Sequence, residues 1–333
     1  MSAIRLRTVD VHAHVVVPEI YERTSRWSVF ARSTDDPALT EDARRQAKER
    51  SDSVIMRMAA ADARIQAMDA MGVDVQVLSA SLVHQCTYEA EPQVALGLDR
   101  SSNDCIAAMV AARPDRFRGL GSVPLQSPVL AVQELTRCMT QLGLSGVTLS
   151  TRVGHIEIGD RSVWPFWSKA EELGAIVFIH PAGNPDARFR SHFLWNSIGQ
   201  SFEETMAIAS LMYEGVLDAF PTLKICVSHG GGYMPFYTGR IARNYLEKPS
   251  TRVNMTKPPG EYLRMLFYDT CVYDPVTLEQ LVARVGADRV LMGSDYPVGE
   301  TKPVAFVEQT AGLSSSDKDK IIGGNAANLF GLA

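Results

Sequence analysis

Five side chains that can bind a metal ion or transfer a proton each follow a short apolar run. They are His12 and His14 in Asp-Val-His-Ala-His, His180 in Val-Phe-Ile-His-Pro, His229 in Val-Ser-His-Gly-Gly-Gly and Asp295 in Gly-Ser-Asp-Tyr-Pro. If the runs are strands, His12 and His14 point to the same side, because residues two apart along a strand share a face. Three imidazoles and one carboxylate suit zinc or a similar cation such as manganese.

A structural interpretation exists for each position taken alone. A single histidine at a strand end usually makes a structural hydrogen bond, and an aspartate before Tyr-Pro usually forms a turn. One divalent ion per chain, however, explains all five positions together. A second ion would need a bridging carboxylated lysine or a glutamate from the middle of a barrel, and Gly146–Ser150 contains neither. We therefore predict a mononuclear site.

The role of His229 has two interpretations. It is either a further imidazole ligand or a free acid/base that takes a proton from metal-activated water and returns one to the substrate. Asp10 either orients a ligand histidine or terminates a turn, and Asp269 either lines the mouth of the fold or makes structural hydrogen bonds. Among the remaining histidines, His192 in a predicted loop is a candidate for substrate contact.

Eight short apolar runs alternate with segments of helical periodicity. Most runs are continuously apolar, as expected of strands that are buried on both faces. The predicted strands are Thr8–His14, Val73–Ser81, Leu120–Leu125, Gly146–Ser150, Ala175–Pro181, Lys224–Gly230, Phe267–Tyr273 and Arg289–Pro297. The predicted helices include Val54–Met68 with Gly72 as its C-terminal cap, Leu130–Leu142, Trp164–Leu173, Phe202–Phe220 and Pro275–Val285.

This alternation predicts an α/β fold, a closed (β/α)8 TIM barrel, with residues 1–333 as its single domain. A doubly wound open sheet is the rival fold, but it would leave the last two strand–helix units without a place. In a barrel the carboxyl ends of all strands meet at one mouth, which would bring the five side chains together. Two long insertions, Val15–Ser53 and Pro181–Gln200, follow ligand-bearing strands, and we interpret them as substrate-contacting loops at the C-terminal face.

The composition argues against several other classes of protein. Of 333 residues 46% are hydrophobic and 21% are charged, as is typical of a soluble protein with a large core. The net charge of -5 and the lack of a basic block argue against nucleic acid as a partner. No stretch approaches the roughly 20 apolar residues that cross a membrane. Five dispersed cysteines indicate reduced thiols in a cytoplasmic protein.

Taken in order, the motifs resemble the amidohydrolase superfamily in its decarboxylase branch, and within it the 2-amino-3-carboxymuconate-6-semialdehyde decarboxylase family. The resemblance spans the chain from end to end. It rests on His12-Ala-His14, Arg64–Val77, Val123–Gln126, Leu223–Gly232, Gly239-Arg240, Gly293–Pro297 and Lys318–Asn325. This resemblance implies that the metal ligands are His12, His14, His180 and Asp295. It also implies that His229 is the acid/base, so that His229 and Asp295 are the catalytic residues.

The resemblance also implies how the substrate is held. Arg240 would reach a substrate carboxylate in the partner subunit's site, which makes the protein a homodimer. A second substrate-binding arginine precedes the first long helix in that family, and the nearest candidates here are Arg50 and Arg57. Trp195 is a candidate for an apolar pocket wall. Ala182 stands where the family's decarboxylase has a tryptophan, so the substrate pocket departs from the family pattern.

The implied reaction is the non-oxidative decarboxylation of a carboxylated muconate semialdehyde or a related dienoic or phenolic acid of aromatic catabolism. Water activated by the metal, with His229 as base, would lead to addition of hydroxide or a proton at the carbon that bears the carboxylate, and carbon dioxide would leave. The alternative on the same residues is a hydrolase or hydratase that acts on a ring-cleavage product or lactone. A non-catalytic metal-binding or ligand-binding role is opposed by the acid/base candidate at His229.

Overall fold

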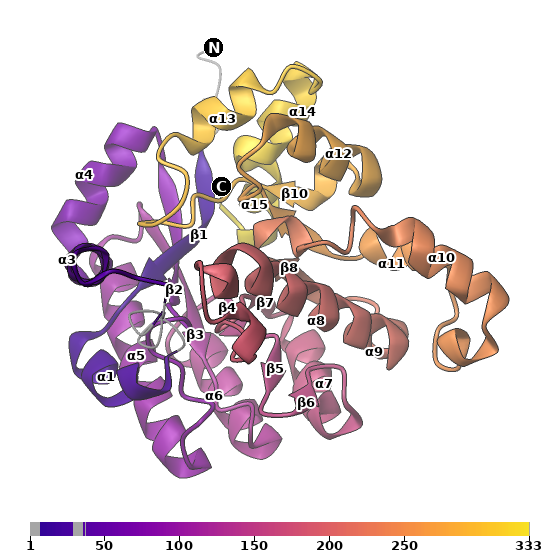
Figure 1. Cartoon of the computed structure of the whole chain (residues 1–333), viewed down its shortest axis with the longest axis horizontal. Coiled ribbons are helices and arrows are strands. Elements are labelled where there is room, and N and C mark those ends of the chain that lie inside the picture. Colours follow the sequence, from indigo (N-terminus) through magenta and orange to yellow (C-terminus); the bar gives the residue numbers. More distant parts are fainter. Residues whose placement is uncertain (1–6, 29–35, 37, 333) are drawn as a thin grey trace.

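The computed structural model describes residues 7–28, 36 and 38–332 and shows a parallel barrel surrounded by helices (Figure 1). The eight strands pair in chain order, and every pair is parallel. They are β1 Val9–Val15, β2 Val75–Ala80, β3 Phe117–Ser122, β4 Gly146–Leu149, β7 Ile176–Ile179, β8 Lys224–Val227, β9 Phe267–Asp269 and β10 Val290–Leu291. Each predicted run overlaps one strand, so the predicted (β/α)8 barrel is confirmed.

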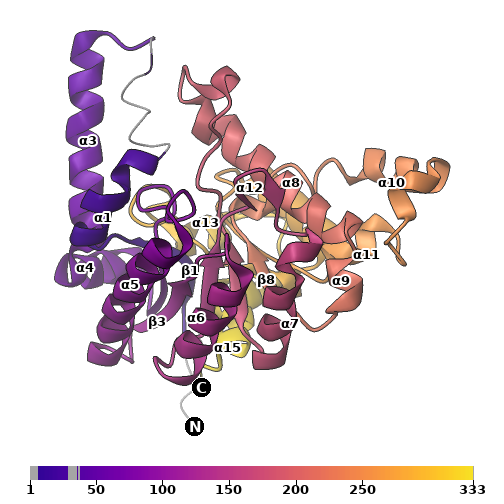
Figure 2. The same ribbon diagram turned by 90° about the horizontal axis from the view of Figure 1, so that it is seen from below.

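Helices cover the outside of the barrel and pack on it through the main hydrophobic core. Those that follow the strands are α4 Ala61–Met71, α5 Pro92–Ala112, α6 Pro128–Thr140, α7 Trp164–Leu173, α8 Ser201–Tyr213, α9 Val216–Ala219, α10 Thr238–Glu247, α11 Pro259–Leu263, α12 Pro275–Val285, α13 Pro303–Gln309 and α14 Ser315–Asp319. The last helix, α15 Asn325–Phe330, packs against the apolar cluster inside the barrel, which includes Val9, Val75 and Leu291. It therefore covers the end of the barrel opposite to the carboxyl ends of the strands (Figure 2).

The barrel closes between β1 and the chain that follows β10. The backbone N–H of Val11 donates to the carbonyl of Met292, and the N–H of His14 donates to the carbonyl of Tyr296, both at 2.9 Å. These bonds extend the pairing beyond the two residues of β10. They also place the segment after β10 directly beside the two histidines of β1.

Asp10 reinforces this closure from the side of β1. Its buried carboxylate accepts from the backbone N–H of Ser294 at 2.9 Å and from the side-chain amide of Gln76 at 2.8 Å. It also accepts from the backbone N–H of His12 at 3.0 Å. The suggestion that Asp10 orients a ligand imidazole is therefore wrong, because its hydrogen bonds join β1 to β2 and to the chain after β10.

The predicted helix Val54–Met68 is two helices. α3, Glu41–Ala59, ends before Ala60, which is extended with φ -90° and ψ 108°, and α4 begins at once. Apolar spacing continues across the break, and therefore the pattern alone predicts one helix. The predicted cap at Gly72 is confirmed, since this glycine is left-handed at φ 73°.

The predicted helix Phe202–Phe220 is also divided. α8 ends at Tyr213 and α9 begins at Val216. Between them Gly215 takes a left-handed conformation at φ 78°, which glycine adopts at little cost and which stops a helix. The apolar residues on both sides of the break remain buried in the main core.

The two insertions stand at the carboxyl end of the barrel, as predicted, but neither is a plain loop. The first contains α1, Pro18–Thr24, and most of α3, while residues 29–35 and 37 lie outside the described residues. The second contains the short turn Ala187–Phe189 and ends in the π-helical turn Trp195–Gln200. Figure 2 shows α3 and the chain that leads into α8 rising on the same side of the barrel.

Three smaller features complete the fold. A hairpin of β5, Arg152–Val153, and β6, Ile156–Glu157, follows β4 and was not predicted. The five cysteines are free thiols, as predicted. Within the described ranges, no helix has the length and apolar character that a membrane span requires.

Arg64 holds the junction of α3, α4 and β1 together. Its guanidinium is fully buried and donates to the carbonyls of His14 at 2.5 Å and Met58 at 3.0 Å, and to the side chain of Gln76 at 3.0 Å. It also lies over the ring of Tyr296, 4.7 Å from the centroid. Burial lowers its pKa to about 10.

Arg64→Leu is expected to destabilise the protein by about 3 kcal/mol or more, because it leaves buried carbonyl groups without donors. The matched control is Arg113→Leu, which removes a guanidinium that is 43% exposed and paired with Asp115. That change should cost less than about 1 kcal/mol. Urea unfolding of both variants at equal metal saturation measures the difference, and equal losses in the two would contradict the role of Arg64.

Candidate metal centre and active site

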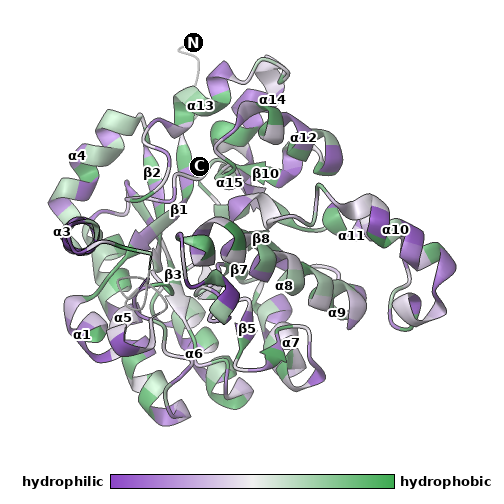
Figure 3. Cartoon of the chain, in the orientation of Figure 1, coloured by the Kyte–Doolittle hydropathy of each residue, from purple (hydrophilic) through white to green (hydrophobic). Residues whose placement is uncertain are grey.

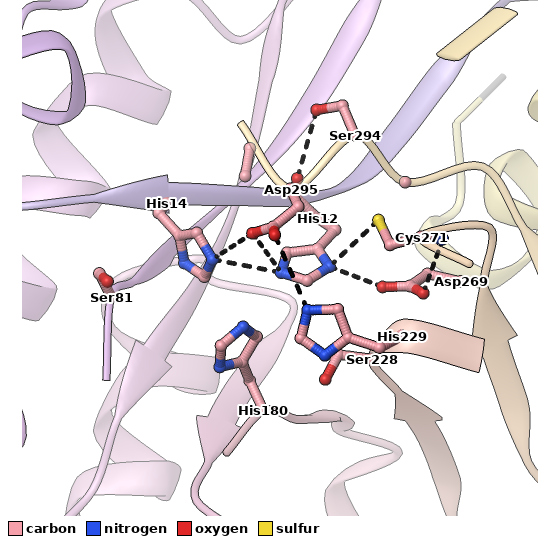
Figure 4. Close-up of polar contacts among 12 residues, drawn as sticks. His12, His14, Ser81, His180, Ser228, His229, Asp269, Cys271, Ser294 and Asp295 are labelled. Atoms are coloured by element: carbon pink, nitrogen blue, oxygen red, sulfur yellow. Dashed lines mark hydrogen bonds and ion pairs between the residues drawn. The ribbon is translucent and has the colours of Figure 1, made fainter. Parts of the chain in front are cut away.

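The five predicted side chains meet at the carboxyl end of the barrel (Figure 4). His12 and His14 come from β1, while the other three follow β7, β8 and β10. All five residues are buried or nearly so. Apart from His180, which is 3% exposed, their side chains are between 0% and 12% exposed. Donor atoms of His12, His180, His229 and Asp295 lie within 4.8 Å of one another.

The innermost atoms have the spacing that a shared cation requires. His14 Nε2 lies 2.9 Å from Asp295 Oδ1 and 3.2 Å from His12 Nε2, and His12 Nε2 lies 3.2 Å from the same Asp295 oxygen. Bonds of about 2.1 Å to one zinc-like ion place neighbouring ligand atoms about 3.0–3.5 Å apart. The His180 ring completes the cluster, with its centroid 4.8 Å from that of His14. These residues therefore fit a divalent ion.

Two of the imidazoles are oriented by acceptors on their outer side. His12 Nδ1 donates to Asp269 Oδ2 at 2.6 Å, and His180 Nδ1 donates to the carbonyl of Pro181 at 2.9 Å. A proton held at Nδ1 leaves the lone pair of Nε2 for a metal. Burial and the neighbouring imidazoles, His14 first, lower the pKa of His180 well below its usual value, so this ring is neutral as a ligand must be.

Asp269 thus does more than the structural hydrogen bonding considered from the sequence. Its second oxygen, Oδ1, accepts from the backbone N–H of Gly230 at 3.1 Å and of Cys271 at 3.1 Å. Asp269 therefore fixes the ring of His12 and, through Gly230, the backbone next to His229.

His229 is paired with a buried carboxylate. Its Nδ1 lies 2.6 Å from Oε1 of Glu204, a fully buried residue of α8 that also accepts from the hydroxyl of Ser228. Burial opposes the charged imidazole most strongly, but the charges of Glu204 and Asp295 and the hydrogen bonds to them together outweigh it and raise the pKa of His229 well above its usual value. The Nε2 atom lies 3.7 Å from Asp295 Oδ2, beside the proposed ligands. This geometry suits an acid/base that is held by Glu204.

Glu204 was missed from the sequence, although a signal was present. It precedes Ala207, Ile208 and Leu211 by three, four and seven positions, which places it on the apolar face of α8. An acid on an apolar face is almost never fully buried without a partner. The partner, His229, lies 25 positions away and is brought to it by the barrel.

The triple glycine after His229 is required by conformation and by space. His229 and the three glycines all have left-handed backbones, with φ between 48° and 78°. A Cβ atom at Gly230 would stand 2.5 Å from the Val272 side chain, and one at Gly231 would stand 2.6 Å from the Tyr268 ring. The glycines therefore let the backbone approach side chains of β9 and of the loop after it closely.

A cavity of about 880 Å³ opens above the cluster. His14, His180, His229 and Asp295 line its floor, and α3 and the second insertion contribute to its walls. Among the predicted substrate contacts, it is lined by Arg50, Trp195 and His192. It is also lined by residues that the sequence did not single out as site residues, including Ser81, His84 and Tyr273.

Two predicted arginines lie outside this cavity. Arg57 belongs to α3 but is exposed and does not line the cavity. Arg240 lies near the start of α10, exposed, on the arm that projects from the barrel at the right of Figure 1. The single chain therefore does not bring Arg240 to its own cavity.

Comparisons with known proteins agree with the resemblance found in the sequence. Residues 9–332 match the model of the amidohydrolase family. The chain is 38% identical over 278 residues to a 2-amino-3-carboxymuconate-6-semialdehyde decarboxylase of Dictyostelium discoideum, covering 81% of this chain and 76% of that protein. It is 32% identical over 290 residues to a gamma-resorcylate decarboxylase of Polaromonas sp., covering 81% and 87%.

A solved structure shows the same fold. It is a dihydroxybenzoic acid decarboxylase from Polaromonas sp. with bound manganese and the inhibitor 2-nitroresorcinol. The TM-score is 0.83 at 24% identity, and the match covers 98% of both chains. This likeness shows the fold, whereas the family match and the 38% identical relative confirm the resemblance stated from the motifs.

The purified protein is expected to bind about one divalent ion per chain, because a single set of ligands converges on one point. His12→Ala and Asp295→Ala should each abolish stoichiometric binding, since they remove an inner ligand atom. His84→Ala is the matched control, a buried cavity histidine outside the proposed ligand set, and it should retain the ion. Elemental analysis after dialysis against the metal provides the measurement. Full metal content in His12→Ala, or none in the wild type after reconstitution, would contradict the site.

Proposed function

Because the chain belongs to the amidohydrolase family, we propose that it is a metal-dependent carboxy-lyase of aromatic catabolism. Its proposed substrate is a carboxylated muconate semialdehyde or a related dienoic or phenolic acid. Relatives that are 38% and 32% identical are named as decarboxylases of such acids, which supports the class of reaction. The observation that carries the proposal is the His229–Glu204 pair beside the metal-ligating cluster on the cavity floor.

In this proposal one divalent ion, Zn²⁺ or Mn²⁺, is held by His12, His14, His180 and Asp295. Three imidazoles and a carboxylate accept either ion, and the manganese of the related structure supports a divalent metal. The bound ion would polarise substrate oxygen atoms and make water more acidic. His229 is then left as the acid/base, since its Nδ1 is held by Glu204 and its Nε2 faces the cluster.

His229 supplies the proton that replaces the carboxylate. Transfer of a proton from its Nε2 to the carbon that bears the carboxylate interrupts conjugation at that carbon. The bond to the carboxylate then breaks, its electron pair restores the conjugated system, and carbon dioxide leaves. The step consumes one proton and no oxidant. Glu204 stabilises the protonated imidazole between turnovers and holds its orientation.

The cavity walls would bind the rest of the substrate. Arg50 would pair with a carboxylate and Trp195 would provide an apolar surface against the conjugated system, since both side chains line the cavity. Arg240 would come from the partner subunit in a homodimer. In support, α10 exposes the large apolar side chain of Leu246, which is 73% exposed, and the guanidinium of Arg240 has no acidic partner among the described residues.

The purified metal-loaded protein is expected to release carbon dioxide from carboxymuconate semialdehydes or hydroxybenzoates. His229→Ala should lower kcat by about 10³-fold while metal content stays normal, because it removes the proton donor and no ligand. Glu204→Gln should lower kcat by about 10–100-fold, because it removes the charge that orients and stabilises the imidazolium. A carbon dioxide assay and elemental analysis measure both effects.

The matched control is Glu203→Gln. Glu203 is the neighbouring acid of α8, but its carboxylate accepts from Arg152 at 3.2 Å and from Asn184 at 2.7 Å and does not contact His229. Its replacement should leave kcat within a few-fold of the wild type. Uptake of water without carbon dioxide release would instead assign the protein to the hydrolases or hydratases, and normal turnover in His229→Ala would reject its assigned role.

A mixing experiment tests the proposed homodimer. Arg240→Ala and His229→Ala should each be inactive, but subunit exchange between them should restore about one quarter of wild-type activity, because half of the dimers are mixed and each has one intact site. Arg243→Ala is the control on the same helix, where Arg243 pairs with Glu247. It should keep full activity alone. No recovery after confirmed exchange would place Arg240 outside the partner's site.

A further inference from the structure

Tyr273 is a cavity residue whose hydroxyl contacts the metal-ligating cluster. It lies four residues beyond the end of β9 and donates to Asp295 Oδ2 at 3.1 Å. Its side chain also lines the cavity, which explains why it is 52% exposed. The sequence motifs and the resemblance assign it no role.

The local backbone is shaped to bring this hydroxyl to the carboxylate. Tyr273 has φ 57° and Asp295 has φ 58°, a left-handed conformation that is uncommon for residues other than glycine. A Cβ atom at Gly299 would stand 2.6 Å from the Tyr273 hydroxyl and 2.7 Å from Asp295 Cβ. Only glycine at position 299 therefore leaves room for the contact. Strained residues of this kind gather at functional sites.

The two oxygens of Asp295 consequently have different neighbours. Oδ1 faces His14 Nε2 at 2.9 Å and His12 Nε2 at 3.2 Å. Oδ2 faces away from that pair and has the Tyr273 hydroxyl as its nearest donor, with His229 Nε2 further off at 3.7 Å. One oxygen is thus directed to the ligand cluster, and the other is held by a neutral donor.

We propose that Tyr273 is a positioning residue that restricts Asp295 to one metal bond, through Oδ1, and thereby keeps a coordination position open for the substrate. The proposal rests on the metal ligation proposed above. A carboxylate with both oxygens free can bind a metal through both. Without the hydroxyl, Oδ2 would turn to the metal and occupy the position that a substrate oxygen needs.

The test uses the cobalt-loaded full-length protein, because the visible absorption of Co²⁺ weakens as its coordination number rises. The wild type and Tyr273→Phe, which lacks only the hydroxyl, should each bind about one Co²⁺ per chain. Tyr273→Phe should show weaker absorption than the wild type. In the carbon dioxide assay its kcat should fall about tenfold with KM changed less than about twofold, as for a lost interaction that acts on the reacting complex.

The matched control is Tyr213→Phe, which removes a hydroxyl from the half-buried last residue of α8 and should keep the wild-type spectrum. An unchanged spectrum in Tyr273→Phe would overturn the proposal. Loss of the ion from this variant would also overturn the proposal, because Tyr273 would then be needed for metal binding itself. Its role would not be to keep a coordination position open. The spectrum requires no turnover, so a failure of the proposed reaction is distinguished from a failure of this inference. A wild type that binds no Co²⁺ would overturn the ligation itself.

Discussion

The pairing of β1 with the chain after β10 decides where the chemistry can take place. The backbone of Tyr296 accepts from His14 and donates to His12, so Asp295 is held above the two histidines of β1. The buried carboxylate of Asp10 fixes the same junction from below through Ser294. These contacts close the barrel, and they hold Asp295, which lies beyond the end of β10, next to the histidines of β1.

Buried charge sets the second constraint. A cluster of imidazoles and carboxylates in a dry site is costly unless each group has a partner. Asp269 accepts from the outer nitrogen of His12, and Glu204 pairs with that of His229, so each of these two histidines has a buried acid as its partner. His12 directs its Nε2 to His14 and Asp295 Oδ1 at 3.2 Å, whereas the Nε2 of His229 lies 3.7 Å from Asp295 Oδ2. Residue type alone does not distinguish these two histidines, but their partners do.

The proposed substrate pocket combines the barrel with the two insertions. The barrel supplies the floor with the proposed metal ligands, while α3 and the second insertion supply Arg50 and Trp195 on the walls. Such a division allows one reaction centre to serve different acids, because the walls can change without disturbing the floor. The exposed arm that carries Arg240 extends the same principle to a second subunit in the proposed dimer. Figure 3 shows apolar positions along this arm beside its polar ones.

The sequence by itself determined the barrel and the convergence of the five candidate side chains at one end of it. Continuous apolar runs specify strands that are buried on both faces, and the spacing of His12 and His14 directs both to one side of β1. Only the tertiary structure decided the partners: His12 and Asp269 lie 257 positions apart, and Tyr273 reaches Asp295 across a turn that no local pattern indicates. The break between α3 and α4 at Ala60 could not be predicted either, because the apolar spacing continues through it. Local periodicity records which face is buried, whereas a hydrogen bond between distant residues depends on how the closed barrel brings them together.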